Sequence, residues 1–349
     1  MAARTRRVVT IDGAGKIAVR TEPVPELVPG AVLVEVKSSL VSPGTELGGV
    51  PAMRKNPNAD APPRPFGYGN AGIVLDMGEG VEGIADGMRV TCMGSGYALH
   101  ATEVVVPQNL VVPIPKGLTF DEAAFAHLAA TALHAVRRGR LEFGSNVMVT
   151  GLGVVGQIAA QIAKASGAHV AGVDRLPMRL RIARECGADF TVNSAREDLA
   201  AKMAQFTRGY GVDTAIVAFG GDATEAIREI LKTMKTAPDG HRMGAIVIVG
   251  GAKFEASWPT GFGNVDVRAS SRPGPGYHDE AWEYGRDYPQ VFVEWTTKRN
   301  LEEVLRAAAE DTLKLRALIT HRVGLEKAPA ACEELIEHPD KALGVILNP

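Results

Sequence analysis

The chain has 349 residues, of which 46% are hydrophobic and 22% are charged, and its formal net charge is −2. This length allows two domains with separate cores, and the near-neutral charge excludes a global field that would attract nucleic acid or a membrane. Three widely spaced cysteines exclude a disulfide framework and favour a reducing cytoplasm. No apolar segment resembles the core of a signal peptide or a membrane span. We therefore expect a cytoplasmic protein without nucleic-acid or membrane partners.

The N-terminal third of the chain is predicted to be rich in β-strands. Short apolar runs separated by proline and glycine predict strands over 7–11, 31–36, 72–77, 89–92 and 103–106. Residues 51–65 are rich in proline and charge, which predicts a loop with no secondary structure of its own.

The pattern changes to a helical period after Thr119. Residues 120–136 predict one helix, with Thr119 as N-cap and Glu122 completing a capping box. Beyond it the sequence predicts alternating strands and helices: strands at 146–150, 169–173, 189–192, 213–217 and 244–249, helices at 154–166, 176–186, 195–207, 222–235 and 300–308, and a last strand-like run at 342–347. Such alternation predicts an α/β fold with a doubly wound parallel sheet.

A glycine motif lies between the first of these strands and its helix. In Gly151-x-Gly153-x-x-Gly156, the first glycine permits a tight turn, the second admits a pyrophosphate and the third packs helix against strand. The helix begins at Val154 and Val155, which directs its positive end towards the phosphates. This arrangement predicts a dinucleotide site, and the alternative is a purely structural glycine turn.

An acidic residue follows the motif at the spacing expected for ribose recognition. Asp174 ends the second strand, near the roughly 20-residue offset at which a carboxylate binds the ribose 2′-hydroxyl of NAD. Arg175 and Arg179 complicate this preference, because a guanidinium can bind the 2′-phosphate of NADP. We expect NAD as cofactor, with NADP possible.

The order of these regions resembles the medium-chain dehydrogenase/reductase superfamily. Marks of the resemblance are the run Val81-Glu-Gly-x-x-x-Gly87-Met-Arg-Val90, the segment from Tyr97 to 107, the helix at Glu122 and the glycine motif. The resemblance implies a GroES-like catalytic domain from residues 1–125 and 290–349 and a Rossmann domain from 126–289. It also implies a nucleotide in the cleft between them and a homodimer or higher homo-oligomer. Further cofactor contacts that it implies are Thr131, Phe219, Gly250 and Gly251.

Segments 39–46, 65–72 and 91–100 are similar to a branch that lacks the usual zinc ligands, which includes bi-domain oxidoreductases and bacteriochlorophyllide dehydrogenases. At the positions of those ligands this chain has Pro43, Tyr68 and His127. Proline offers no ligand atom, a phenol titrates near pH 10, and one histidine does not hold a catalytic zinc. We expect no metal, and the alternative is convergence of Cys92, His100 and His127 in space.

Without zinc, the charge on the reacting oxygen needs protein donors. Tyr68 carries a phenol donor, and Thr45 matches a hydroxyl that passes a proton in zinc relatives. Glu46 is a candidate to orient a donor or bind a hydroxylated substrate. His127 and His100 have the pKa range for proton exchange. For each residue a structural role is the alternative.

The segment 270–289 is rich in arginine, aromatic and acidic residues. Arg272 suits an anionic group, and Tyr277 and Trp282 suit stacking on a sugar-like or cyclitol-like substrate, whereas the alternative is a loop at a subunit contact. The resulting hypothesis is an NAD(P)-dependent alcohol dehydrogenase/reductase that interconverts a secondary alcohol and a ketone without zinc. The alternatives are a zinc-independent enone or quinone reductase and a non-catalytic NAD(H)-binding sensor.

Overall fold

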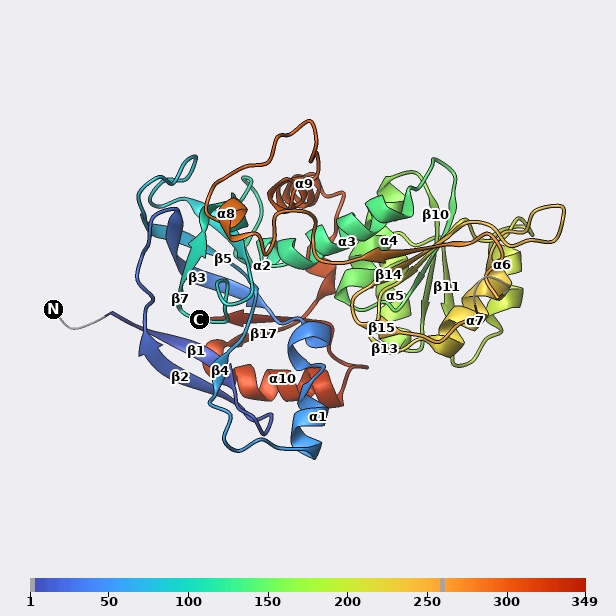
Figure 1. The fold of residues 1–349 in the computed structure, drawn as a ribbon. Helices are drawn as coiled ribbons and strands as arrows, with labels where there is room; N and C mark the ends of the chain where they lie inside the picture. Colours follow the sequence, from blue (N-terminus) through green and yellow to red (C-terminus); the bar gives the residue numbers. More distant parts are fainter. Residues whose placement is uncertain (1–3, 258–260) are drawn as a thin grey trace. The chain divides into compact units, whose positions relative to one another are not determined.

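The computed structural model describes residues 4–257 and 261–349, and the chain forms two compact units (Figure 1). Unit 1 comprises Met1–Ala130, Pro273–Asp311 and Ile319–Pro349, and unit 2 comprises Thr131–Arg272 and Thr312–Leu318. Residues 1–3, the start of the basic N-terminal run, lie outside the described part.

This division differs from the expected domain boundaries at one segment in particular. Residues 273–289 belong to unit 1 and not to the nucleotide-binding part of the chain. The side-chain amides of Gln108 and Asn109 hold this segment, because they donate hydrogen bonds to the carbonyls of Tyr284 at 3.0 Å and Trp282 at 2.7 Å.

Unit 1 is built on β-sheets whose strands come from both ends of the chain. Near the C-terminus, Ile346 pairs with Leu40 in antiparallel register, so the last strand completes the N-terminal sheet. The strand order is β17-β18-β3-β5-β6-β8, with β7 also paired to β3, and a smaller sheet has the order β2-β1-β4. These strands are β1 (Thr5–Ile11), β2 (Ile17–Pro23), β3 (Ala31–Leu40), β4 (Arg64–Pro65), β5 (Gly69–Met77), β6 (Arg89–Met93), β7 (Glu103–Pro107), β8 (Val111–Pro113), β17 (Ile319–Gly324) and β18 (Gly344–Asn348).

Two predictions for unit 1 are wrong in detail. The expected loop 51–65 contains α1 (Val50–Lys55), because Pro51 stands in the first helical turn, where no backbone N–H is needed. The expected helix 120–136 is broken into α2 (Phe120–Ala123) and α3 (Ala126–Gly139). At the break the Phe125 amide bonds to the Glu122 carbonyl three residues back, which tightens the turn. The capping box of Thr119 and Glu122 is confirmed.

The other helices of unit 1 are α8 (Glu280–Glu283), α9 (Thr297–Ala309) and α10 (Ala328–Glu337). The apolar residues of α10 pack with those of β1, β18 and the segment around Val50 in one buried cluster. This cluster fixes the base on which the turn after β3 is built.

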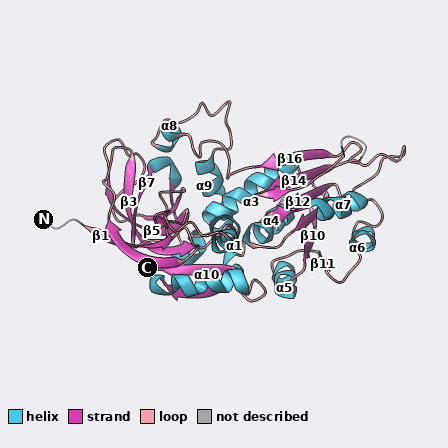
Figure 2. Ribbon diagram, turned by 60° about the horizontal axis from the view of Figure 1, so that its bottom comes forward, coloured by secondary structure: helices cyan, strands magenta, loops and turns pink. Residues whose placement is uncertain are grey.

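Unit 2 contains the expected parallel sheet, with strand order β11-β10-β9-β12-β14-β16, and its last strand, β16, was not predicted from the sequence. Helices α4 and α5 cover one face and α6 and α7 the other, which is the doubly wound arrangement (Figure 2). The elements are β9 (Asn146–Thr150), α4 (Val154–Ala165), β10 (His169–Asp174), α5 (Pro177–Glu185), β11 (Phe190–Asn193), α6 (Leu199–Phe206), β12 (Thr214–Val217), α7 (Thr224–Thr233), β14 (Ala245–Val249) and β16 (Asp266–Ser270), with a short ladder of β13 (Gly221–Asp222) and β15 (Ala252–Lys253).

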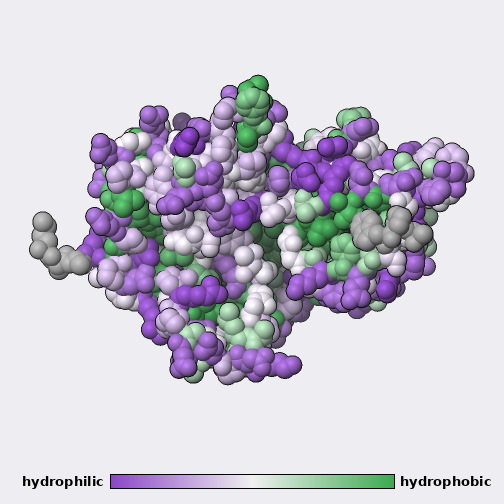
Figure 3. Space-filling view, in the orientation of Figure 1, coloured by the Kyte–Doolittle hydropathy of each residue, from purple (hydrophilic) through white to green (hydrophobic). Residues whose placement is uncertain are grey.

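Hydrophilic side chains cover much of the face seen in Figure 3, and smaller apolar areas lie on both units. Among the described residues, no helix has the length and apolar character needed to cross a membrane.

Candidate active site

The glycine turn of unit 2 is shaped by close backbone packing. Gly151 has φ of +87°, a conformation that favours glycine. A Cβ atom at Gly156 would lie 1.8 Å from the Gly151 carbonyl oxygen, so any side chain there would displace the turn. At Gly153, by contrast, nothing lies within 4 Å of a Cβ position. The fold itself therefore leaves the backbone at Gly153 open to an approaching ligand.

The first turn of α4 offers an anion site next to Gly153. Gly153 is the N-cap and gives no side-chain hydrogen bond, so no cap occupies the N–H groups that begin the helix at Val154 and Val155. These N–H groups and the helix dipole both favour a negatively charged ligand. The residues therefore fit the pyrophosphate of a dinucleotide.

Asp174 supports the same turn from the end of β10. Its carboxylate accepts hydrogen bonds from the backbone N–H of Leu152 at 2.7 Å and of Leu176 at 2.9 Å. Arg179 lies beside it, with 3.7 Å between guanidinium nitrogen and carboxylate oxygen, and Arg175 is exposed. Asp174 thus combines a structural role with the position expected for ribose recognition.

The remaining predicted cofactor residues also lie in unit 2. The side chain of Phe219 lies 3.1 Å from the Cβ position of Gly151, which places it against the glycine turn. Gly250 has φ of +84° directly after β14, and the Gly251 carbonyl accepts a bond from Gly221 at 3.3 Å. Thr131 is half-buried at the start of the unit.

In unit 1, the hydroxyl of Tyr68 joins a group of polar side chains just before β5. It donates a hydrogen bond to Ser42 Oγ at 2.8 Å and approaches Thr45 Oγ1 at 3.4 Å. Burial, and next the negative charge of Glu46, raise the pKa of Tyr68 to about 12. The phenol is therefore protonated at neutral pH and acts as a hydrogen-bond donor.

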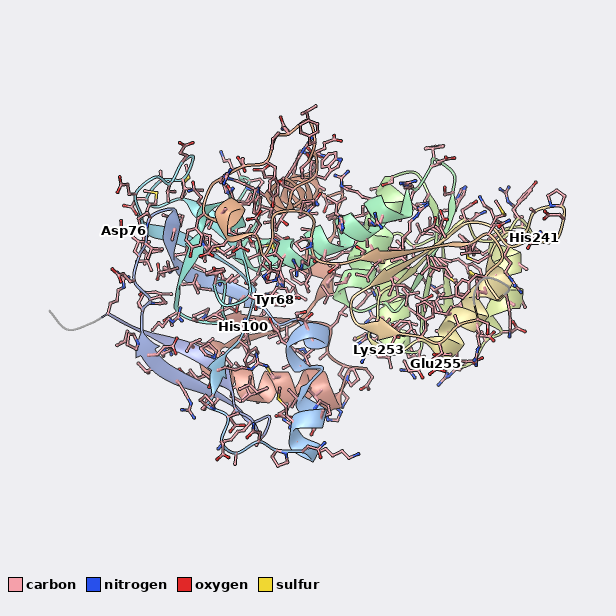
Figure 4. All side chains as sticks on the ribbon, viewed as in Figure 1. Tyr68, Asp76, His100, His241, Lys253 and Glu255 are labelled. Atoms are coloured by element: carbon pink, nitrogen blue, oxygen red, sulfur yellow. The ribbon has the colours of Figure 1, made fainter. Side chains whose placement is uncertain are left out.

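Glu46 and His100 are hydrogen-bonded to each other, and Glu46 also bonds to Ser42, the partner of Tyr68. Glu46 Oε2 accepts hydrogen bonds from the Ser42 N–H at 3.0 Å and from His100 Nε2 at 3.0 Å. His100 Nδ1 lies 2.9 Å from Ser39 Oγ. The His100 side chain is 0% exposed and that of Glu46 is 3% exposed, so neither is open to solvent. Figure 4 shows Tyr68 and His100 in the same part of unit 1, whereas Asp76 lies at the far end of β5.

His127 lies against Tyr68, with ring centroids 4.7 Å apart in an edge-to-face contact. Its Nδ1 donates a hydrogen bond to the Ala124 carbonyl at 3.0 Å. Burial lowers the pKa of His127 to about 3, so the ring is neutral at physiological pH and does not suit the predicted proton exchange. A Cβ atom at Gly69 would lie 2.0 Å from this ring, which shows that the glycine after Tyr68 makes room for His127.

The predicted substrate residues separate into different environments. The hydroxyl of Tyr277 accepts a hydrogen bond from the Ser95 N–H at 2.8 Å. Trp282 is 1% exposed and stacks on Tyr288 with centroids 6.1 Å apart, so its predicted stacking on a substrate is wrong. Arg272 is exposed, has φ of +66° and ends the main segment of unit 2.

Comparison with known proteins finds similarity to dehydrogenases. A family described as Zinc-binding dehydrogenase matches residues 154–283. Mouse sorbitol dehydrogenase is 26% identical over 359 residues, which cover 93% of this chain and 91% of that protein. The D-guloside 3-dehydrogenase of Escherichia coli is 29% identical over 292 residues, covering 80% and 76%. The structure of galactitol-1-phosphate dehydrogenase from Escherichia coli superposes with a TM-score of 0.79 at 20% identity, covering 98% and 100%.

The family match and the relatives over most of the chain support the medium-chain dehydrogenase/reductase superfamily that the sequence resembles. Its β-rich part has the GroES-like fold of this superfamily, and its parallel sheet has the Rossmann fold. Both fold assignments made from the sequence are confirmed.

The residues at the superfamily's zinc positions do not fit a zinc ion in this chain. Pro43 has no ligand atom, and the Tyr68 hydroxyl donates a hydrogen bond to Ser42 Oγ, whereas a zinc site needs about three protein ligands. Cys92 is 1% exposed, and burial raises the pKa of its thiol. Among the described residues, no three His, Cys, Asp or Glu side chains are grouped so as to hold a metal, and Cys92, His100 and His127 form no such group.

Sequence reasoning missed Ser39, Ser42 and Gly69. Ser42 immediately precedes the Pro43-Gly-Thr-Glu run, and a serine before such a turn is a signal that could have found it. Ser39 carried no such signal, because only the fold brings it to His100.

Proposed function

We propose that this protein is an NAD(P)-dependent oxidoreductase that interconverts a secondary alcohol and a ketone of a polyol-like substrate without catalytic zinc. Two relatives are named sorbitol dehydrogenase and D-guloside 3-dehydrogenase. Both names refer to polyhydroxylated compounds, which supports this substrate class. A sugar-like or cyclitol-like compound is the finer proposal.

The proposed cofactor is a nicotinamide dinucleotide, which when bound supplies or accepts the hydride. The backbone at Gly151, Gly153 and the start of α4 would hold its pyrophosphate, and Asp174 its ribose hydroxyls. Asp174 favours NAD, because its carboxylate repels a 2′-phosphate. Arg179 and Arg175 offset part of that repulsion, so NADP remains a weaker alternative ligand.

The protonated hydroxyl of Tyr68 is the single observation that carries the zinc-free mechanism. In ketone reduction the substrate oxygen gains negative charge, and a phenol O–H directed at it stabilises that charge. Ser42 and Thr45 lie within reach of the same hydroxyl and can return a proton to it. Tyr277, whose hydroxyl bonds to the Ser95 N–H, is the proposed substrate contact in the segment 273–289.

The variant Tyr68→Phe tests this mechanism. We expect turnover to fall by roughly 10²-fold, because one general-acid contact is removed, while nucleotide binding stays unchanged. Tyr288→Phe is the matched control, since this phenol also has its pKa raised to about 12 but donates to Asp279 at 2.6 Å. Near-normal turnover in Tyr68→Phe would remove Tyr68 from the mechanism.

Assays with NADH and NADPH against polyols, ketones, enones and quinones test the reaction class. Turnover with polyols or ketones supports the proposal, whereas turnover only with enones or quinones supports the C=C reductase, and binding of NADH without turnover supports a sensor. About one zinc per chain, lost together with activity on chelation, would contradict the zinc-free site. A cytoplasmic homo-oligomer is also proposed, and light scattering measures its size.

A further inference from the structure

We propose that Glu46 and His100 form a buried positioning pair, which fixes the turn bearing Ser42 and Thr45 against the hydroxyl of Tyr68. This inference rests on the proposed function in one respect, the role of the Tyr68 hydroxyl at the substrate oxygen. The pair itself is defined by hydrogen bonds within unit 1.

The turn closes on itself through Glu46. Residues Pro43–Leu47 form a short π-helical turn, a conformation that is rare and often found at functional sites. The Glu46 N–H bonds to the Ser42 carbonyl at 2.9 Å, and the Glu46 carboxylate bonds back to the Ser42 N–H at 3.0 Å. Ser42 is thus held at both backbone groups, while its hydroxyl remains directed at Tyr68.

His100 connects this turn to the segment that carries Tyr68. Its ring nitrogen bonds to Glu46 Oε2 at 3.0 Å, and its backbone N–H bonds to the Phe66 carbonyl at 3.1 Å, two residues before Tyr68. The ring of Phe66 also lies edge-on to the His100 ring, 5.4 Å away. Both sides of the contact between Tyr68 and Ser42 are therefore attached to one residue.

The second ring nitrogen of His100 anchors the pair to the sheet. It lies 2.9 Å from Ser39 Oγ, and Ser39 pairs with Asn70 in the register between β3 and β5. Because β5 begins directly after Tyr68, this bond fixes the pair relative to the strand that positions the phenol.

The burial of the pair indicates a role other than stability. Glu46 Oε1 is buried, and no donor in residues 4–257 and 261–349 bonds to it. A buried carboxylate with one unsatisfied oxygen and a histidine partner is costly to desolvate, and apolar side chains of similar volume would pack at lower cost. What this pair provides instead is a fixed geometry and a negative charge beside Tyr68.

The charge of Glu46 also acts directly on the phenol. After burial, Glu46 is the largest cause that raises the pKa of Tyr68, which keeps the phenol protonated. The other titratable groups that face the phenol are Tyr277 and His127, and the latter is neutral because burial lowers its pKa. Among the described residues that face the phenol, Glu46 is thus the charged one, so the pKa of Tyr68 measures the effect of the Glu46 charge.

Two variants separate geometry from charge. Glu46→Ala removes the bonds to Ser42 and His100, and we expect hydrogen exchange of the Ser42 amide to accelerate at least 10-fold. Glu46→Gln keeps an acceptor oxygen but loses the charge. In this variant the Tyr68 phenol should titrate at least half a pH unit lower, followed by NMR of ¹³Cζ-labelled tyrosine and assigned by loss of the signal in Tyr68→Phe.

Asp121→Asn is the matched control for loss of a carboxylate in unit 1. Asp121 accepts bonds from Ser38, Arg322 and Asn348 and does not contact the Tyr68 group. This variant should change neither the Ser42 exchange rate nor the Tyr68 titration. If the Glu46 variants do not fold, His100→Gln should still accelerate exchange at the Ser42 amide.

Activity gives the final readout. In Glu46→Ala we expect kcat to fall about 10-fold with KM nearly unchanged, because the pair positions Tyr68 and does not bind substrate. Unchanged Ser42 exchange in Glu46→Ala together with unchanged Tyr68 titration in Glu46→Gln would overturn the positioning pair. Altered exchange and titration with full turnover in Tyr68→Phe would instead leave the pair standing and reject the proposed role of Tyr68.

Discussion

The glycine turn of unit 2 and the Tyr68 group of unit 1 are built in opposite ways. In the glycine turn the atoms that matter are backbone atoms, and the sequence controls them mainly by leaving side chains out at Gly151, Gly153 and Gly156. In the Tyr68 group the atoms that matter are side-chain oxygens and nitrogens, held by hydrogen bonds between distant segments. The first kind of site depends on space, and the second depends on bonding and charge.

The largest effect should come from filling space in the glycine turn. Gly156→Ala would place a Cβ atom 1.8 Å from the Gly151 carbonyl, so we expect the free energy of unfolding to fall by about 3 kcal/mol in urea titrations. Gly153→Ala meets nothing within 4 Å and should cost less than about 1 kcal/mol, while weakening nucleotide binding. Equal losses of stability in the two variants would contradict the claim that space controls the glycine turn.

The second effect concerns charge in the Tyr68 group. Since the pKa of His127 is lowered to about 3 from 6.5, the unfolded state binds more protons, and stability should fall as pH decreases from about 6.5 towards 3. One such group contributes a slope of about 1.4 kcal/mol per pH unit. Urea titrations between pH 6 and pH 4 measure the free energy of unfolding at each pH. In His127→Asn, its slope against pH should be shallower by about this amount. An unchanged slope would assign the acid sensitivity to other groups, such as His134, whose pKa burial also lowers.

The smallest effect concerns Asp174, whose side chain supports the glycine turn by accepting a hydrogen bond from the Leu152 N–H. Asp174→Asn keeps an oxygen for one of the two backbone N–H groups but removes the charge. We expect the ratio of NADPH to NADH affinity to rise about 10-fold, because repulsion of the 2′-phosphate is lost while Arg179 remains. Calorimetric titration with both nucleotides measures this ratio. A ratio that does not move would show that Asp174 acts on the turn alone.

The same contrast explains what could be predicted from the sequence. The strand–glycine–helix pattern around Gly151 is local, so five strands of the parallel sheet, the helices between them and the turn followed from residue order, whereas β16 did not. The break between α2 and α3 did not, because the helical period of residues 120–136 continues through the buried Phe125.

The Tyr68 group could be predicted only in part. Tyr68, Thr45, Glu46 and His100 were recognised as candidates by type, but their connection through Ser42 was not. Trp282 was misjudged because composition does not distinguish an aromatic side chain in a binding site from one in the core. Hydrogen bonds between residues far apart in the chain have no periodic signature in the sequence.

The fit of Gly69 beneath the His127 ring limits the order in which this site can change. A larger residue at position 69 collides with the ring while histidine stands at 127, since the Cβ atom alone would come within 2.0 Å of it. Replacement of His127 by a small residue would first have to vacate that space. The order of substitutions therefore matters on a path from this site to a metal-binding one. Replacement of His127 first leaves room for a side chain at position 69. Replacement of Gly69 first passes through a poorly folded protein.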